Sequence, residues 1–296
     1  MVRAVRWRRS PSTGFTTTTS APLYWARYGP EGAPKLIVLH GGPGAHHDYL
    51  LPQMLHLAER YDVIFYDQRG GGRSRSDDRE PVTWRTHVDD LASIVREFGL
   101  VPLSIVGYSW GGLLAVLYAL TAADDSSLPP PARLVLIDPA PLARKYRDQF
   151  EAEFAKRQKG PAIQRMREEL AQSGLRDSDP DAWRKATFEL SVAGYFAHPE
   201  NARDLTPFRV MARIQQSVWE SLGDYDLIPQ LGKIRCPTLV VHGRDDPIPA
   251  ESSIEGAEVM KARLVVLDDC GHVPYVEQPA RLFAAVDAFL AESDPQ

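Results

Sequence analysis

The chain has 296 residues, enough for one large α/β domain with an insertion or for two smaller domains. Its net charge of -5 at neutral pH gives no electrostatic reason to expect nucleic acid or an anionic membrane as a partner. No apolar run approaches the roughly 20 residues that a membrane-spanning helix needs, and the N-terminal segment lacks the apolar stretch of a secretory signal. The two cysteines are too few for a disulfide scaffold, so we expect a cytoplasmic protein.

The first part of the chain alternates short apolar runs with turns. We expect an edge strand at residues 2–7, followed by strands at 22–28 and 35–39. The run at 35–39 is continuously apolar after its lysine, which is typical of a strand covered on both faces. These patterns indicate a sheet with helices packed on its two sides.

A glycine-rich segment, His40-Gly41-Gly42-Pro43-Gly44, directly follows the strand at 35–39. Several glycines at a strand end let the backbone approach a ligand closely, and backbone N–H groups are what an oxyanion hole requires. We therefore predict that the N–H of Gly42 is one oxyanion donor.

The next segment predicts a helix at 48–59, a strand at 61–66 and an amphipathic helix at 83–98. The loop at 67–74 between them is rich in glycine, which would also suit a phosphate. It lacks the Gly-Lys-Ser/Thr ending of a phosphate-binding loop, so we interpret it as a structural loop that borders the site.

The pattern Gly-x-Ser-x-Gly directly follows the predicted strand at 103–106, as Gly107-Tyr108-Ser109-Trp110-Gly111. This is the nucleophile elbow, a sharp turn in which the two glycines leave room for a serine exposed at the tip. The helix that follows presents free N–H groups to any negative charge formed beside Ser109. We predict Ser109 as the nucleophile and the N–H of Trp110 as the second oxyanion donor.

The residue pattern changes after a predicted strand at 133–137, which ends at Asp138-Pro139. From about residue 142 to 230 helical spacing dominates, and regular alternation of strands and helices resumes near residue 237. We therefore expect an α/β fold with a mostly parallel twisted sheet flanked by helices and interrupted by a helical cap. The expected division is 1–141 for the first part of the core, 142–231 for the cap and 232–296 for the rest of the core.

A serine nucleophile needs a base that is held in the right tautomer by a carboxylate, and in this architecture the chain order is Ser, Asp or Glu, then His. Asp245 and Asp246 follow one predicted strand and His272 follows the next. Both positions lie where open α/β sheets place ligands. We predict His272 as the base and Asp246 as the triad acid, with Asp245 as the alternative.

We expect the seven other histidines to be structural or surface residues rather than catalytic ones. His40 and His242 adjoin strand ends and are expected to support turns, and five are expected on the surface or in loops: His46, His47, His56, His87 and His198. No group of histidines and cysteines has the spacing of a zinc site. We expect no metal and no cofactor.

Three of these motifs together resemble the proline iminopeptidase family of α/β-hydrolases: the segment 40–44, the loop Asp67-Gln68-Arg69-Gly70 with Gly72-Arg73-Ser74, and the elbow continued by Gly112. The resemblance spans both parts of the core. It implies a serine aminopeptidase that removes an N-terminal residue, often proline, from short peptides, with Ser109, Asp246 and His272 as the triad. It also implies a cap that binds the free amine of the substrate through acidic side chains.

The cap segment Val218-Trp219-Glu220 is similar to one that carries such a glutamate, so the resemblance points to Glu220. One branch of the family has a second glutamate directly after the triad aspartate, where this sequence has Pro247. Asp224 and Asp226 are alternatives, and each cap carboxylate could equally be part of a solvated helix face. Hydrolysis is therefore better specified than proline preference.

Two other functions use the same residues differently. An esterase, lactonase or amino-acid amidase would place the same triad under a different lid, and a binding protein would retain the fold without activity. Haloalkane dehalogenases and epoxide hydrolases need an aspartate at the position of Ser109, which disfavours both. The substrate expected here is a short peptide or a small amide or ester.

Overall fold

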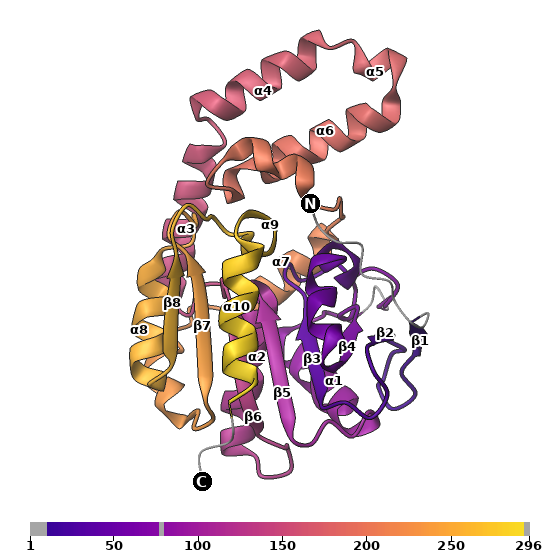
Figure 1. Ribbon diagram of the computed structural model, residues 1–296, viewed down its shortest axis with the longest axis vertical. Coiled ribbons are helices and arrows are strands. Elements are labelled where there is room, and N and C mark those ends of the chain that lie inside the picture. Colours follow the sequence, from indigo (N-terminus) through magenta and orange to yellow (C-terminus); the bar gives the residue numbers. More distant parts are fainter. Residues whose placement is uncertain (1–10, 77–79, 293–296) are drawn as a thin grey trace.

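Eight strands form one sheet in the order β1-β2-β4-β3-β5-β6-β7-β8 in the computed structural model, which describes residues 11–76 and 80–292 (Figure 1). The strands are β1 (Ser12–Phe15), β2 (Tyr24–Tyr28), β3 (Lys35–Leu39), β4 (Asp62–Tyr66), β5 (Leu103–Tyr108), β6 (Pro131–Ile137), β7 (Thr238–Gly243) and β8 (Arg263–Leu267). β2 pairs antiparallel with β1 and β4, and the remaining pairs are parallel. The edge strand expected at residues 2–7 lies outside the described residues.

Alternate side chains of the central strands enter two separate hydrophobic cores. Ile37 and Leu39 of β3 belong to one core, whereas Leu36 and Val38 belong to the other. This alternation follows from the two-residue repeat of a strand, and it explains why the run at 35–39 is apolar throughout.

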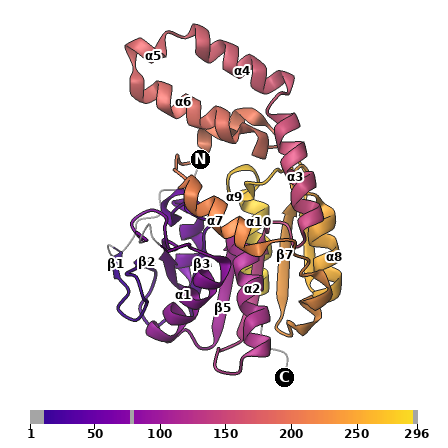
Figure 2. The ribbon, with the colours of Figure 1, turned by 180° about the vertical axis from the view of Figure 1, so that it is seen from behind.

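Helices cover both faces of the sheet. The α-helices are α1 (Trp84–Glu97), α2 (Trp110–Asp124), α3 (Arg144–Arg157), α4 (Pro161–Gln172), α5 (Leu175–Ser178), α6 (Pro180–Val192), α7 (Ala212–Leu222), α8 (Ala250–Met260), α9 (Pro274–Glu277) and α10 (Pro279–Leu290). The 3₁₀ helices are η1 (His47–Leu50), η2 (Gln53–Glu59), η3 (Ala193–Tyr195), η4 (Pro199–Asp204) and η5 (Ile228–Lys233). Residues of α1, α2 and α8 join one core, and residues of η1, η2 and α10 join the other (Figures 1 and 2).

One predicted element differs in kind. The single helix expected at residues 48–59 is instead the pair of 3₁₀ helices η1 and η2, which are separated by Leu51 and Pro52. Proline has no N–H to donate and disfavours the helical region for the residue before it, so Pro52 interrupts the helix. The apolar residues that gave the segment its helical spacing are nevertheless buried in η2.

Helical segments alone connect β6 to β7 within the described chain. Figure 2 shows α4, α5 and α6 extending away from the sheet as an arm, whereas α7 lies against the core beside α1. Ser217 and Ser221 of α7 bond to the segment around the start of α1, through Val82 O at 2.8 Å and Trp84 N at 3.0 Å. The arm and α7 are thus held differently, although both fall in the predicted cap, 142–231.

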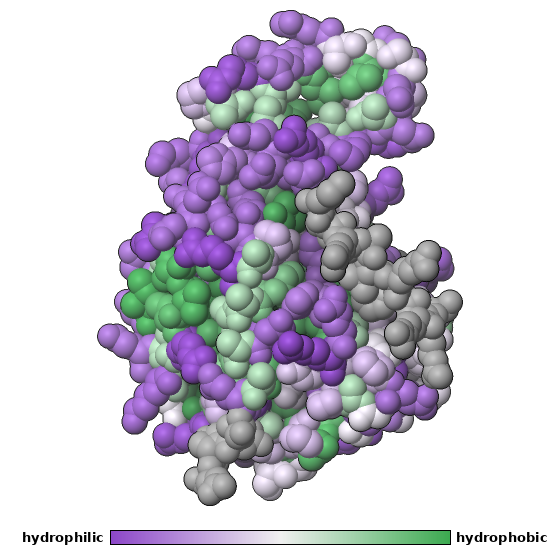
Figure 3. Space-filling view, in the orientation of Figure 1, coloured by the Kyte–Doolittle hydropathy of each residue, from purple (hydrophilic) through white to green (hydrophobic). Residues whose placement is uncertain are grey.

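Figure 3 shows hydrophobic residues gathered between α4 and α6, while the outer side of the arm is hydrophilic. Ile163 and Leu170 of α4 are buried, as expected for an amphipathic helix that packs against a neighbouring element. In the described residues, no helix is both long and apolar enough to cross a membrane.

Candidate active site

Ser109 occupies a strained turn between β5 and α2. Its backbone has φ 53° and ψ -120°, a region that residues other than glycine rarely adopt. A Cβ on Gly107 would lie 2.4 Å from the carbonyl oxygen of Gly111, and a Cβ on Gly111 would lie 2.2 Å from that of Leu39. The glycines of the motif are therefore required by space, and the turn holds Ser109 at the carboxyl end of the sheet.

The structure brings Ser109, His272 and Asp246 into one chain of hydrogen bonds. Nε2 of His272 lies 2.9 Å from Oγ of Ser109, and Nδ1 of His272 lies 2.7 Å from Oδ2 of Asp246. An ionised carboxylate only accepts, so the proton of the neutral ring is on Nδ1 and Nε2 is free to accept from the serine. The neighbouring Asp245 is exposed and makes no such contact, so the geometry favours Asp246 over Asp245.

The environment of Asp246 favours its ionised form. Burial alone would raise the pKa of this carboxyl, but the attraction of His272 and the hydrogen bond between them hold the pKa below its ordinary value. The N–H of Ile248 donates a further hydrogen bond of 2.7 Å to Oδ1. The imidazole thus faces a carboxylate that is both charged and fixed in place.

Gly42 and Trp110 face the same cavity as Ser109. Trp110 is the first residue of α2, so its N–H has no partner within the helix. For the N–H of Gly42, with φ 59°, the structure likewise gives no partner among residues 11–76 and 80–292. Two backbone donors without partners, on residues that line one cavity with a serine, are what an oxyanion site requires.

A buried polar chain links the three sequence motifs. The indole N–H of Trp110 donates to Oε1 of Gln68 at 2.8 Å, and Nε2 of Gln68 donates to the carbonyl of His40 at 2.8 Å. The backbone N–H of Gln68 donates to Nε2 of His40 at 3.0 Å, so the other ring nitrogen carries the proton toward Gly41 O. Gln68 therefore connects the segment that holds Gly42 to the residue after Ser109.

The loop at 67–74 folds around the buried carboxylate of Asp67. Asp67 accepts from the N–H of Arg73 at 2.9 Å and from Nδ1 of His47 at 2.7 Å. A Cβ on Gly72 would lie 2.4 Å from Oδ2 of Asp67, which explains a glycine in this loop. The expectation that His47 and His87 lie on the surface or in loops is wrong, because both are buried, His47 in η1 and His87 in α1.

Glu277 ties the loop of His272 to the cap. It accepts from the N–H of Gly271 at 2.7 Å and from that of Ala197 at 3.1 Å. The N–H of His272 donates to the carbonyl of Tyr195 at 2.7 Å, and the two rings lie 5.1 Å apart. In the sequence, Glu277 looks like an ordinary residue in a short helix, and no local pattern signals this role.

A cavity of about 910 Å³ opens over Ser109 and His272 and is enclosed on the cap side by α3, α6 and α7. Aromatic side chains, including Phe150, Phe188 and Trp219, line much of it. An enclosure of this size lined largely by apolar side chains is typical of a site for a small ligand.

Charged residues of the cap also line this cavity. Glu220 does so and is exposed, with Nε2 of Gln216 donating to it at 2.7 Å. Glu151 and Arg147 line it as well, and they form an ion pair of 2.8 Å. Neither was identified from the sequence, although their spacing of four residues on a helix is a signal for such a pair.

The two aspartates considered as alternatives to Glu220 are placed differently. Asp224 and Asp226 are not among the residues that line the cavity. Oδ1 of Asp226 instead accepts from the N–H of Ile228 at 3.0 Å, which stabilises a turn. Their positions favour Glu220 as the carboxylate that a substrate can reach.

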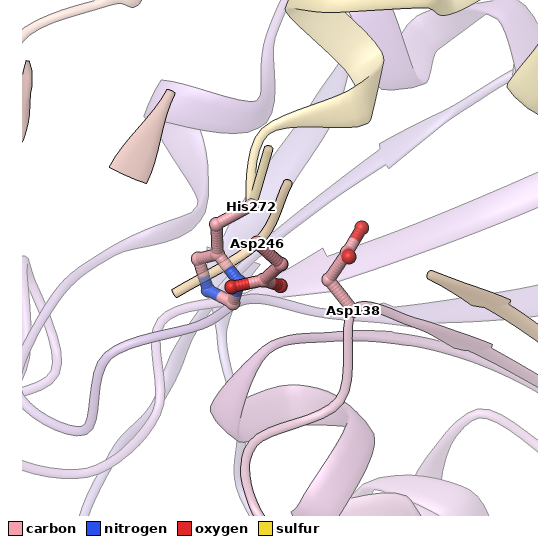
Figure 4. A group of neighbouring side chains, drawn as sticks. All are labelled: Asp138, Asp246 and His272. Carbon is pink, nitrogen blue, oxygen red and sulfur yellow. The ribbon is translucent and has the colours of Figure 1, made fainter. Parts of the chain in front are cut away.

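Figure 4 shows Asp138, Asp246 and His272 gathered at the carboxyl ends of the strands. One potential ligand atom from each lies within 4.8 Å of the others. A metal bound there would have to replace the hydrogen bond between Asp246 and Nδ1 of His272. We therefore interpret this group as part of the Ser109 site.

Residues 36–286 match the alpha/beta hydrolase family, and the chain belongs to that family. The match confirms the fold class predicted from the sequence. The chain is similar to a proline iminopeptidase from Heyndrickxia coagulans, with 28% identity over 293 residues that cover 94% of this chain and 98% of the relative. The protein is thus a hydrolase by family, with proline iminopeptidases among its relatives.

Solved structures share the fold. A proline iminopeptidase-related protein from Thermus thermophilus superposes with a TM-score of 0.73 at 22% identity, covering 96% of this chain and 98% of that one. The enol-lactonase from Burkholderia xenovorans does so with a TM-score of 0.66 at 21% identity, covering 94% and 100%. Since the fold accommodates different hydrolytic reactions, function must be argued from the site.

Proposed function

We propose that this protein is a serine aminopeptidase that releases an N-terminal residue, proline or a small apolar one, from short peptides. The hydrogen-bonded chain from Ser109 through His272 to Asp246, facing a cavity with an accessible carboxylate, carries the proposal. Each of these three residues lies just after the end of a strand, so the sheet fixes their positions relative to one another.

In the proposed reaction, His272 Nε2 takes the proton of Ser109 as Oγ attacks the carbonyl carbon of the substrate. The N–H groups of Gly42 and Trp110 bind the resulting oxyanion. His272 then gives its proton to the amine nitrogen as the C–N bond breaks and an acyl-enzyme remains. Water attacks this ester while His272 accepts its proton, which releases the N-terminal residue and regenerates Ser109.

The charge pattern of the cavity supports recognition of a free amine. Glu151 already pairs with the guanidinium of Arg147, whereas the side-chain partner of Glu220 is the neutral amide of Gln216. Glu220 therefore has no charged side-chain partner in the described part of the chain and is available to pair with the ammonium of a substrate. A charge-assisted hydrogen bond of this kind contributes about 1.5–3 kcal/mol.

A panel of proline and alanine arylamides, each with a free and an acetylated amine, tests the proposal. We expect hydrolysis of the free-amine substrates only, and a loss of at least about 10⁴-fold in Ser109→Ala. Glu220→Gln should raise KM for free-amine substrates about tenfold or more, while Asp224→Asn, outside the cavity, should leave KM unchanged. Equal hydrolysis of free and acetylated substrates would contradict the aminopeptidase assignment.

An esterase or lactonase for anionic substrates is the second candidate, because Arg144 and Arg147 also line the cavity. Such an enzyme would prefer an aryl ester that carries a carboxylate, such as a nitrophenyl hemisuccinate, over any amino-acid arylamide. The same panel extended by this ester distinguishes the two candidates.

A further inference from the structure

A second buried carboxyl group lies behind the pair of Asp246 and His272. Asp138 follows β6, which neighbours β7 in the sheet, and its side chain is fully buried (Figure 4). Its backbone has φ 39°, an uncommon conformation for a residue other than glycine. One carboxyl oxygen of Asp138 lies within 4.8 Å of one carboxyl oxygen of Asp246.

The distribution of donors distinguishes the two carboxyl groups. Asp246 accepts from Nδ1 of His272 and from the N–H of Ile248, each at 2.7 Å. Oδ1 of Asp138 accepts from the N–H of Gly243 at 2.7 Å, but the buried Oδ2 has no donor among the described residues. Two carboxyl groups this close can form a hydrogen bond only if one of them carries a proton, and Asp138 is the one whose second oxygen has no donor.

The surroundings of Asp138 contain no compensating charge for a second carboxylate within the part of the chain that the structure describes. The titratable groups that interact with its charge there are Asp246, His242, His272, Glu277, Cys270, Tyr108 and Tyr275, with neither lysine nor arginine among them. His242, at 3.9 Å, is held neutral because burial lowers its pKa and because its two nitrogens bond to Ile248 O and Ser253 Oγ.

Two adjacent carboxylates cannot both ionise in such a dry site. Burial raises the pKa of Asp138 well above its ordinary value, and the negative charge of Asp246 raises it further. This agrees with the count of donors, which already assigned the proton to Asp138. A neutral acid beside an ionised partner can act as a hydrogen-bond donor.

We propose that Asp138 is a neutral carboxylic acid that donates its proton in a hydrogen bond to Asp246 and thereby positions Asp246 against His272. The inference rests on the proposed function, because it assigns Asp246 as the partner of the catalytic base. Asp246 then accepts three hydrogen bonds, from His272, Ile248 and Asp138, which fix the rotation of its carboxylate. Asp138 is a positioning residue, since it acts on the reaction only through Asp246.

Asp138→Asn and Asp138→Val separate the possible roles. Asparagine is neutral, has nearly the same shape and can still accept from Gly243 and donate to Asp246, so kcat and the acid limb of the pH profile should stay near the wild-type values. Valine removes the donor, so kcat should fall at least about tenfold with little change in KM. If Asp138 were ionised, Asp138→Asn would remove a charge near His272 and shift the acid limb to lower pH by about one unit or more.

A measurement without substrate keeps the inference distinct from the proposed function. The infrared difference spectrum between the wild type and Asp138→Asn at pH 7 should contain the carbonyl stretch of a protonated carboxylic acid in the wild type. The carboxylate bands of Asp246 should remain in both proteins. Absence of the protonated-acid band, or full kcat in Asp138→Val, would overturn the inference even if the protein hydrolyses arylamides.

Discussion

The indole N–H of Trp110 donates a hydrogen bond of 2.8 Å to the side-chain carbonyl of Gln68, deep in the core. Gln68 belongs to the loop after β4, whereas Trp110 is the first residue of α2 and lines the cavity together with Ser109. Trp110 is also held from the cap side, because Trp219 of α7 packs against its ring with the centroids 5.4 Å apart. The position of one proposed oxyanion donor therefore depends on a glutamine that never meets the substrate.

Replacing Gln68 by leucine leaves the buried indole N–H and the His40 carbonyl without partners. We expect the free energy of unfolding to fall by about 1–3 kcal/mol, since buried polar groups that lose their partners keep their desolvation cost. We also expect kcat to fall while KM changes little, because oxyanion binding matters only in the transition state. Urea unfolding and arylamide kinetics measure both effects, with the exposed Gln230→Leu as the control. Unchanged stability in Gln68→Leu would contradict the polar chain.

The elbow glycines can be tested for their requirement of space. Gly111→Ala would place a Cβ 2.2 Å from the Leu39 carbonyl oxygen, so we expect a loss of about 2 kcal/mol or more in the free energy of unfolding. Gly232→Ala is the matched control, because its Cβ would meet only a side-chain carbon of Val259 at 3.9 Å. Thermal unfolding of the two variants should separate them clearly. Equal melting temperatures would mean that the turn relaxes at little cost.

Glu277→Gln tests whether the clamp between the cap and the loop of His272 matters. Burial raises the pKa of Glu277, and three backbone N–H groups oppose that shift by donating to its carboxylate. An amide would turn one acceptor into a donor that faces those N–H groups, so we expect lower kcat and about 1–3 kcal/mol less stability. Glu255→Gln, an exposed surface pair with Lys145, should change neither. A fully active Glu277→Gln enzyme would exclude this role.

Two buried histidines predict a dependence of stability on pH. Burial lowers the pKa of His40 and of His87 to about 4, whereas both titrate near 6.5 in the unfolded chain. Between these values the unfolded chain binds more protons, so the free energy of unfolding should fall as the pH drops from about 6.5 to about 4. The loss is at most about 3 kcal/mol for each histidine. His87→Gln should make the measured slope shallower, and an identical slope would contradict this explanation.

Much of the core could be predicted from local patterns in the sequence. The strand expected at 35–39 has the bounds of β3, and the strand and helix around Ser109 are where the motif predicts them. The strain at Ser109 needs glycines on both sides, so the motif itself carries the geometry. Because strand ends gather at one edge of a parallel sheet, chain order was enough to bring Asp246 and His272 toward Ser109.

The remaining features depend on contacts that no local pattern encodes. Asp138 looked like a residue in a proline-rich turn, and its role follows only from the adjacency of β6 and β7. The pair of Arg147 and Glu151 reaches the cavity because of how α3 packs, which helical spacing does not specify. The apolar spacing on both sides of Pro52 predicts one helix at 48–59, although proline itself favours an interruption, which the structure shows.

If Ser109 is a nucleophile activated by His272, a fluorophosphonate should label it, and peptide mass spectrometry locates the label. We expect a single modification on the peptide that contains Ser109, and its loss in Ser109→Ala. Labelling should be strongly slowed in His272→Gln, which removes the base but retains the nucleophile. Failure of the folded protein to react would favour a binding protein on a hydrolase fold, and a label that persists in Ser109→Ala would exclude Ser109 as the reactive residue.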